Sequence, residues 1–289
     1  MRSMVCNKRD WLGPLVLAVI TLTGGSITAN ADTTGLGSLP APTLWLELDN
    51  AATNAMMWGK DLSSFITLDA ATGNWGFTND FHWDSNGKLA DGTTPLYSID
   101  IKASDNHGNV DPFINYSVAV RNNSATSVTF NRVFNAPIAP NITGANTVQA
   151  SVGGVITDGT GNGASITPTP LPSIQQDSDG ISELQILRLH SATTNSWTNA
   201  GVDVGQTQSY SGAGLHVYGV YSAGPVAGPL GSWDQMQINS RFTLSGGGDT
   251  ASLSGYAEIL PVPEPAGWMT LSVGLLVAGY MARRRNEIN

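Results

Sequence analysis

Short segments in which apolar and polar residues alternate recur along the middle of the chain. In Leu44-Trp45-Leu46-Glu47-Leu48, for example, every second residue is leucine. Because successive side chains of a β-strand point to opposite faces, this two-residue period predicts strands with one buried face. The segments that we predict as strands are 44–48, 65–68, 97–101, 116–120, 128–134, 148–156, 184–189 and 215–221.

The segments between these strands carry turn residues. Ser85-Asn86-Gly87 and Thr157-Asp158-Gly159 combine glycine with side chains that tolerate a positive φ, as tight turns require. Between residues 32 and 260, no segment keeps a helical period over three turns, and 51–58 is the only modest helix candidate. The pattern predicts a mainly β fold, an antiparallel β-sandwich.

Two stretches near the end of this region bear on its topology. Segments 236–244 and 251–260 alternate on either side of Gly246-Gly247-Gly248-Asp249, so we predict a terminal β-hairpin. Residues 158–180 are rich in Gly, Thr, Pro and Ser. They predict a long surface loop or, as the alternative, a boundary between two half-domains.

The first 31 residues have the pattern of a signal peptide. Arg2, Lys8 and Arg9 precede an apolar run from 11 to 22, and Ala29 and Ala31 supply the small residues that signal peptidase requires. We predict cleavage after Ala31; the alternative, a retained membrane helix, needs a longer apolar run. The single cysteine, Cys6, precedes the run, so the mature chain has no disulfide, thiolate nucleophile or cysteine-bound zinc.

The last residues have the pattern of a membrane anchor. Residues 266–282 carry no charge over 17 positions, which as a helix reach about 25 Å and can span a bilayer with little tilt. Trp268 and Tyr280 lie near the two ends of this run, where rings favour the headgroup region. Three arginines, Arg283, Arg284 and Arg285, follow it. These features predict a transmembrane helix with the arginines on the cytoplasmic side and the preceding domain outside.

Three features, Pro263-Glu264-Pro265, the apolar run and the arginines, occur in the order of a PEP-CTERM sorting signal, which the tail resembles. The resemblance implies processing by an exosortase and delivery to the envelope or an extracellular polysaccharide matrix. The alternative is an ordinary single-pass anchor in which Pro263, Glu264 and Pro265 form only a linker. Residues 43–260 also look like the β-rich ectodomains that such tails often follow. Tails of this type are also labelled as C-terminal domains of ice-binding proteins, but no regular Thr-x-Thr array is present.

The charge balance bears on the partners of the exported domain. The chain has a formal net charge of −9, and residues 32–260 hold seven Lys or Arg against 19 Asp or Glu. An acidic surface repels phosphate backbones, so we predict no binding to nucleic acid.

One cluster of aromatic residues suggests a ligand. Trp75, Phe77 and Trp83 lie close together with Asp80 between them, and aromatic faces with short polar groups are suited to sugars. The alternative is that these large side chains fill the core of the sandwich.

Two acidic turns are weak candidates for calcium. One holds Asp177, Asp179 and Glu183, and the other holds Asp105, Asn109 and Asp111. Calcium takes six to eight oxygen ligands, and neither turn reproduces a complete calcium-binding pattern. We therefore predict no metal and no cofactor. The chain also lacks a Gly-x-Ser-x-Gly elbow and a phosphate-binding glycine loop, so we predict no enzymatic activity. A carboxylate pair of Glu47 with Glu183 or Glu258 could be judged only from their separation in space.

These observations predict a signal peptide at 1–31, a β-sandwich ectodomain at 32–260 and a sorting segment at 261–289. The expected protein is an inner-membrane-anchored precursor facing the periplasm, later found at the cell surface or in the extracellular matrix. Its expected role is structural or adhesive, with signal peptidase, exosortase, the membrane and exopolysaccharide as partners. The alternative is a carbohydrate-binding module that tethers the cell to its exopolysaccharide.

Overall fold

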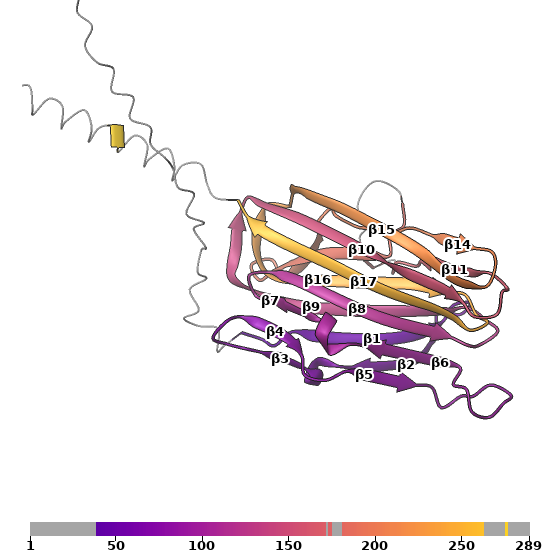
Figure 1. The fold of residues 1–289 in the computed structure, drawn as a ribbon. Coiled ribbons are helices and arrows are strands. Elements are labelled where there is room, and N and C mark those ends of the chain that lie inside the picture. Colours follow the sequence, from indigo (N-terminus) through magenta and orange to yellow (C-terminus); the bar gives the residue numbers. More distant parts are fainter. Residues whose placement is uncertain (1–38, 172, 175–180, 263–274, 277–289) are drawn as a thin grey trace, which may run out of the picture. The chain divides into compact units, whose positions relative to one another are not determined.

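The computed structural model describes residues 39–171, 173–174, 181–262 and 275–276. In this part of the chain, an eight-stranded and a nine-stranded antiparallel sheet form a sandwich-like fold (Figure 1). The prediction of a mainly β, antiparallel sandwich is therefore confirmed. The predicted signal peptide lies outside the described residues, as does the sorting segment from residue 263 apart from 275–276. Among the residues that are described, no helix is long and apolar enough to cross a bilayer.

We call the eight-stranded sheet, sheet A, and the nine-stranded sheet, sheet B. Sheet A contains β1 (Thr43–Asn50), β2 (Met56–Asp61), β9 (Val128–Gly144), β11 (Ala164–Pro168), β12 (Gln185–Ser191), β13 (Ser196–Asn199), β14 (Gln208–Tyr210) and β16 (Gly231–Leu244). Sheet B contains β3 (Ile66–Leu68), β4 (Asn74–Phe77), β5 (Phe81–Asp84), β6 (Tyr97–Ile101), β7 (His107–Asn109), β8 (Phe113–Asn122), β10 (Asn146–Asp158), β15 (Gly214–Ala227) and β17 (Asp249–Pro261). Two short 3₁₀ helices, η2 (Ser63–Phe65) and η3 (Ala103–Asp105), lie between strands.

Alternation along the strands produces the apolar core. Leu44, Leu46 and Leu48 of β1 are buried, and the residues between them are more exposed at Trp45 and Glu47. On β8 of the other sheet, the alternate residues from Ile114 to Val120 are buried in the same way. Side chains from both sheets join in one apolar cluster. Each of the predicted strand segments overlaps a strand of the structure, and β9 extends ten residues beyond the predicted end at Phe134.

The prediction of a terminal hairpin is wrong. Strand β16 lies in sheet A between β9 and β12, whereas β17 lies in sheet B between β10 and β8. Residues 245–248 therefore carry the chain from one sheet to the other. Both strands gain a hydrogen-bonded neighbour on each side, which a two-stranded hairpin cannot offer. Alternation shows that a strand has one buried face, but it does not show which strand lies beside it.

Two further predictions need correction. Residues 51–58 do not form a helix: the side-chain oxygen of Asn50 accepts hydrogen bonds from the N–H groups of Ala52 and Thr53, and the chain turns back into β2. The region 158–180 is not a loop throughout, because it contains β11, which pairs with β14 and β16. Oδ1 of Asp158 accepts hydrogen bonds from the N–H groups of Thr160 and Gly161, and Oδ2 accepts one from the N–H group of Gly163, which holds the turn before β11.

Candidate functional site

The aromatic cluster predicted from the sequence is divided between core and surface. Trp75 and Phe77 are only 3% and 8% exposed, and Trp75 packs on the ring of Phe134 with centroids 4.7 Å apart. Their faces are not open to a ligand, so as binding residues these two are corrected to core residues. They are buried because β4 directs them toward sheet A. This matches the alternative given above, in which these large aromatic side chains fill the core of the sandwich.

The other two members of the predicted cluster lie at the surface. Trp83 is half-buried and stacks on Trp58 of sheet A, with ring centroids 4.3 Å apart, so one face of its ring is covered. Asp80 is exposed and accepts hydrogen bonds from the Lys102 ammonium and from the N–H group of Ala103. The bond from Lys102 is the main cause of the lowered pKa of Asp80. These contacts make Asp80 an anchor for the segment before η3.

The remaining sequence-predicted residues do not form a site in the described structure. Ala29, Ala31, Asp177 and Asp179 lie outside the described residues, as do the predicted processing and anchor residues of the tail, Pro263, Glu264, Pro265, Trp268, Tyr280, Arg283, Arg284 and Arg285. Glu183 is buried. Within the described ranges, no group of three or more His, Cys, Asp or Glu side chains could hold a metal ion. Glu47 and Glu258 are on different sheets, β1 of sheet A and β17 of sheet B, and both alternate with buried core residues. They therefore lie on opposite outer faces and cannot form a catalytic pair.

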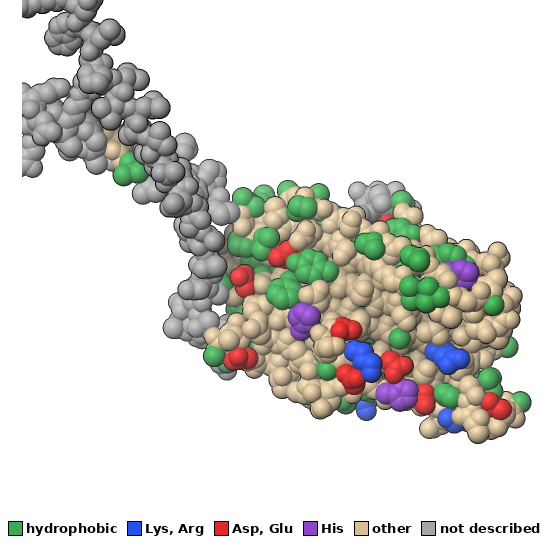
Figure 2. All heavy atoms as spheres, viewed as in Figure 1, with side chains coloured by type: hydrophobic (Ala, Val, Ile, Leu, Met, Phe, Trp, Pro, Cys, Tyr) green, Lys and Arg blue, Asp and Glu red, His purple; other side chains and the backbone are tan. Residues whose placement is uncertain are grey.

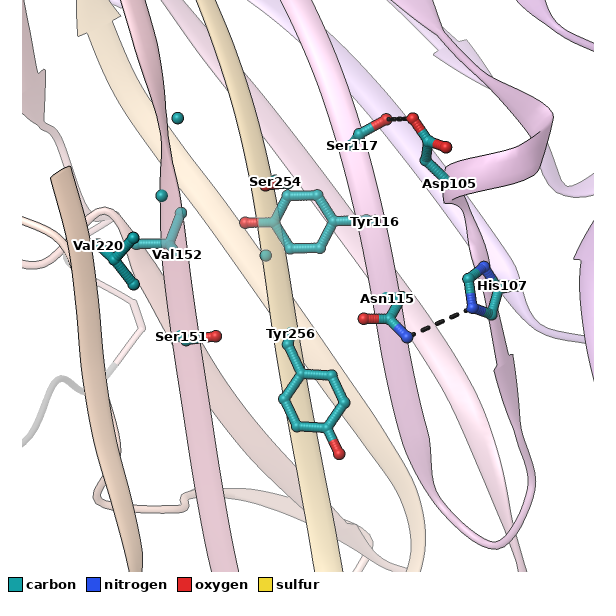
Figure 3. A pocket seen from close by; sticks show the side chains of 13 residues that line it. Asp105, His107, Asn115, Tyr116, Ser117, Ser151, Val152, Val220, Ser254 and Tyr256 are labelled. Carbon is teal, nitrogen blue, oxygen red and sulfur yellow. Dashed lines mark hydrogen bonds between the residues drawn. The ribbon is translucent and has the colours of Figure 1, made fainter. Parts of the chain in front are cut away.

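A row of hollows on the outer face of sheet B is the strongest candidate site. The first hollow, of about 440 Å³, lies over the middle of β8, β17 and β10 (Figure 3). A second, of about 310 Å³, shares Asp105, Ser117 and Ser254 with it. A third, of about 390 Å³, shares Asp100 and Ala119 with the second. We call this continuous depression the outer groove.

The strand alternation that builds the core also exposes the residues of the outer groove. On β8, Asn115 and Ser117 lie on the face opposite the buried Ile114, Tyr116 and Val118. On β17, Ser254 and Tyr256 alternate in the same way with buried residues, and the two strands pair along this length. Figure 1 shows β10, β17 and β8 side by side, and Figure 3 shows these side chains over them.

A glycine pair on β10 keeps the floor of the first hollow low. Gly154 has φ of 155°, and an added Cβ would lie 2.1 Å from the carbonyl oxygen of Ser252. The pairing of β10 with β15 is irregular between Gly154 and Val155. Beyond this floor, Val220 of β15 stands 80% exposed as the opposite wall of the hollow.

Two residues that line the first hollow, Tyr256 and His107, carry rings, and both contact the ring of Phe113 beside it. Tyr256 and Phe113 stack with centroids 6.4 Å apart and planes 26° apart. The rings of Phe113 and His107 lie nearly perpendicular to each other, with centroids 6.2 Å apart. Burial, with a smaller contribution from the hydrogen bond to Glu258, raises the pKa of the Tyr256 phenol. Tyr256 therefore presents its ring to the hollow, while its hydroxyl contacts Glu258.

Hydrogen-bonding groups line the rest of the first hollow. The Ser117 hydroxyl donates to Asp105 over 3.1 Å, and Asp105 also accepts from Ser104. The Asn115 amide lies 3.4 Å from Nε2 of His107. His107 therefore contacts an amide, and Ser117 contacts a carboxylate. The hollow thus offers groups that can form hydrogen bonds next to aromatic rings that can form apolar contacts.

The charged residues of the outer groove lie mainly at its other end. In Figure 2, the acidic, basic and histidine side chains gather over one part of this face, and apolar side chains over another. Nδ1 of His82 lies 2.7 Å from Asp100, and its Nε2 lies 3.4 Å from Asp84. The hydrogen bond to Asp100 is the main cause of the raised pKa of His82. These charges therefore compensate one another.

A second polar cluster lies on the outer face of sheet A. Arg241 and Asp49 form a buried ion pair with a distance of 2.9 Å. Glu47 lies next to Asp49, and burial together with the hydrogen bond to Asp49 raises its pKa. Asn131 and Asn239 are also buried on this face. Polar side chains of the neighbouring strands β1, β9 and β16 therefore lie together on the outer face of sheet A.

Sequence reasoning missed the outer groove because its residues come together only through long-range pairing. The alternation of Asn115 and Ser117, or of Ser254 and Tyr256, is visible in the sequence, but the register that sets Tyr256 opposite Asn115 spans 141 positions. The available signal was one aromatic residue among the alternate, polar positions of each of the segments 113–117 and 252–256. The first segment was missed because the predicted strand began only at residue 116.

Comparisons with known proteins do not assign a family. No family model and no curated protein matches the chain. Solved structures that align with it include those of infectious bursal disease virus, the Gx strain at 10% identity and the Gt strain at 12%. The alignments cover 79% and 80% of this chain, with TM-scores of 0.13 and 0.14. This chain spans 63% of the length of either viral chain, and the TM-scores are too low for the likeness to support an inference.

Proposed function

We propose that this chain is an exported protein that its C-terminal tail sorts to the cell surface or extracellular matrix, where its β-sandwich has a structural or adhesive role. The proposal rests on the sequence patterns of the two ends and on how the described domain meets the tail. Strand β17 continues to Pro261, and the N–H group of Val262 still donates to the carbonyl of Ala145. Backbone hydrogen bonding therefore continues from β17 to Val262.

The place of β17 in sheet B supports an anchoring role. It pairs with β10 from Thr250 to Pro261 and with β8 from Asp249 to Glu258. A tail attached to this strand transmits a pull along the strand axis into two ladders at once, so many hydrogen bonds share the load. An attachment at an edge strand would load one ladder only. The junction is therefore suited to a domain that is held at its C-terminus.

The sorting role is tested by changing the tripeptide and following the protein in its producing organism. The variant carries Pro263→Ala, Glu264→Ala and Pro265→Ala, and the control carries Glu287→Ala, which removes a charge outside the tripeptide. We expect the wild type and the control at the surface or in the matrix, as measured by cell fractionation and by digestion with an external protease. We expect the triple variant to stay in the inner-membrane fraction. Equal sorting of the triple variant, or a wild-type protein in the cytosol, would overturn the proposal.

A further inference from the structure

We propose that the outer groove binds a neutral polysaccharide chain. This inference rests on the proposed function, because an exported matrix protein meets such polymers, and it gives that protein a partner. The site differs from the aromatic cluster suggested by the sequence, since Trp75 and Phe77 are buried. The residues that carry the inference are Tyr256, Phe113, His107, Asn115, Ser254 and Ser117.

The rings supply the apolar part of sugar recognition. Phe113 and Tyr256 stand on neighbouring strands, stack on each other, and are half-buried, so part of their surface faces the solvent. A pyranose presents an apolar face of C–H groups, which packs on an aromatic ring and releases water from both. The ring pair lies beside the hollow, where a bound sugar can contact a ring and the hydroxyl groups of the floor together.

The polar groups supply directional contacts for hydroxyl groups. The amide of Asn115 offers both a donor and an acceptor, and the hydroxyls of Ser151 and Ser254 can do either. Sugar hydroxyls also donate and accept hydrogen bonds, so they can replace the water molecules that these polar side chains lose on binding.

The charge of the groove selects a neutral polymer. Asp105 is the charged residue that lines the first hollow, and its carboxylate faces Ser117. In the second hollow, Lys102 pairs with Asp80 over 2.8 Å, so its ammonium is already compensated. The third hollow holds both signs of charge, because the carboxylates of Asp84 and Asp100 line it together with His82 and Arg121. A uronic acid or sulfated chain would meet the Asp105 carboxylate and the negative net charge of the whole protein.

The shape of the groove favours a chain over a small molecule. The three hollows adjoin through shared residues and follow one face of the sheet, from Tyr256 to Arg121. Pockets that bind small molecules cover most of the ligand surface. An open depression of this kind instead covers one side of an extended ligand, and several sugar units can contribute in turn.

The test uses the full-length chain purified in detergent and the neutral exopolysaccharide extracted from the producing organism, cut into oligosaccharides. Binding is measured by isothermal titration calorimetry, and alginate serves as the anionic probe. Ser254→Phe places a large ring over the exposed floor of the hollow, and Tyr256→Ala removes the ring wall. Asn115→Leu keeps the size of the side chain and removes its hydrogen-bonding groups. Thr67→Phe is the matched control, because Thr67 is exposed on β3 of the same sheet and does not line the groove.

We expect the wild type and Thr67→Phe to bind the neutral oligosaccharides alike, and alginate not to bind. Each of the three groove variants should weaken binding at least about tenfold, the loss of one good ring or hydrogen-bond contact. Thermal melting shows which variants are folded, and three independent substitutions keep the test decisive if one of them is not. The inference is overturned if the wild type does not bind the neutral oligosaccharides, or if the folded groove variants bind as well as the wild type. Failure of binding by a correctly exported protein would leave the proposed function standing, whereas failure of sorting would not change binding in solution.

Discussion

Replacement of Arg132 by methionine should stabilise the protein. Arg132 lies on β9 with 1% of its surface exposed, and its three side-chain nitrogens have no hydrogen-bond partner among the described residues. Its guanidinium carbon lies 4.0 Å from the centre of the Tyr116 ring and 5.3 Å from that of Phe134. The stacking is favourable, but an unpaired buried charge is costly.

The size of the effect follows from the pKa. Burial lowers the pKa of Arg132 from 12.5 to about 10. At about 1.4 kcal/mol per pKa unit, this shift corresponds to roughly 3 kcal/mol of cost for the charged form. Stacking of the Arg132 guanidinium on the Tyr116 ring offsets about 1–2 kcal/mol of this cost. Methionine fills a similar volume without a charge, so Arg132→Met should raise the free energy of unfolding by about 1–2 kcal/mol.

Urea unfolding at pH 7 measures this change, and Arg121→Met, at an exposed position of β8, is the control, expected within about 0.5 kcal/mol of the wild type. The cost also has a characteristic pH dependence. Between about pH 10 and 12.5 the folded state loses the Arg132 proton before the unfolded state does, so this contribution to stability should rise with pH in the wild type and be absent in Arg132→Met. A loss of more than about 1 kcal/mol in Arg132→Met would refute the reasoning, because it would show that the guanidinium is well paired in solution.

Three further predictions concern single contacts. Gly108→Ala would place a Cβ 2.1 Å from the Phe113 carbonyl oxygen and 2.3 Å from the Trp75 ring, so its free energy of unfolding in urea should fall by about 3 kcal/mol. In the control Gly76→Ala, the nearest atoms to the new Cβ are 3.8 Å away, and the free energy of unfolding should fall by less than about 1 kcal/mol. Equal losses in the two variants would contradict this prediction. Tyr116→Phe removes a buried hydroxyl that lies 2.6 Å from Gln185 Oε1 and 3.0 Å from Ser240 Oγ. The same assay should show a free energy of unfolding lowered by about 1–3 kcal/mol. An unchanged urea midpoint would show that these two hydrogen bonds do not contribute to stability. The pKa of Asp91 should be about 2, because the Thr94 hydroxyl and the N–H groups of Thr93 and Thr94 hold its carboxylate. The resulting stabilisation is present above the ordinary pKa of 3.8 and is lost as the pH falls through 2, so NMR titration should show a midpoint near 2, and a midpoint near 3.8 would contradict the contacts.

The local pattern of the sequence predicted every strand longer than six residues, because alternation is a property of a single strand and needs length to be seen. The strands that it did not predict are the shorter β2, β4, β5, β7, β11, β13 and β14. Leu44, Leu46 and Leu48 are buried as their spacing indicated. Strand partners were not predictable in the same way. Segments 236–244 and 251–260 are neighbours in the sequence but join different sheets, since each gains two pairing strands from distant parts of the chain.

The candidate site shows the same limit. Alternation alone did not decide whether Trp75 faced a ligand or the core, because either face of β4 could have been the buried one until its place between β3 and β7 was known. Asn50 shows a different limit. Its side chain reverses the chain at a point where composition favoured a helix, because one side-chain oxygen captures two backbone N–H groups.

We propose that both ends of the chain are signals for export and sorting and that the β-sandwich between them is the part that reaches the outside. The most direct measurement is the intact mass of the protein isolated from its producing organism. We predict a chain that begins at Asp32 and ends close to Pro265. A mass that corresponds to the whole chain from Met1 to Asn289 would contradict the account.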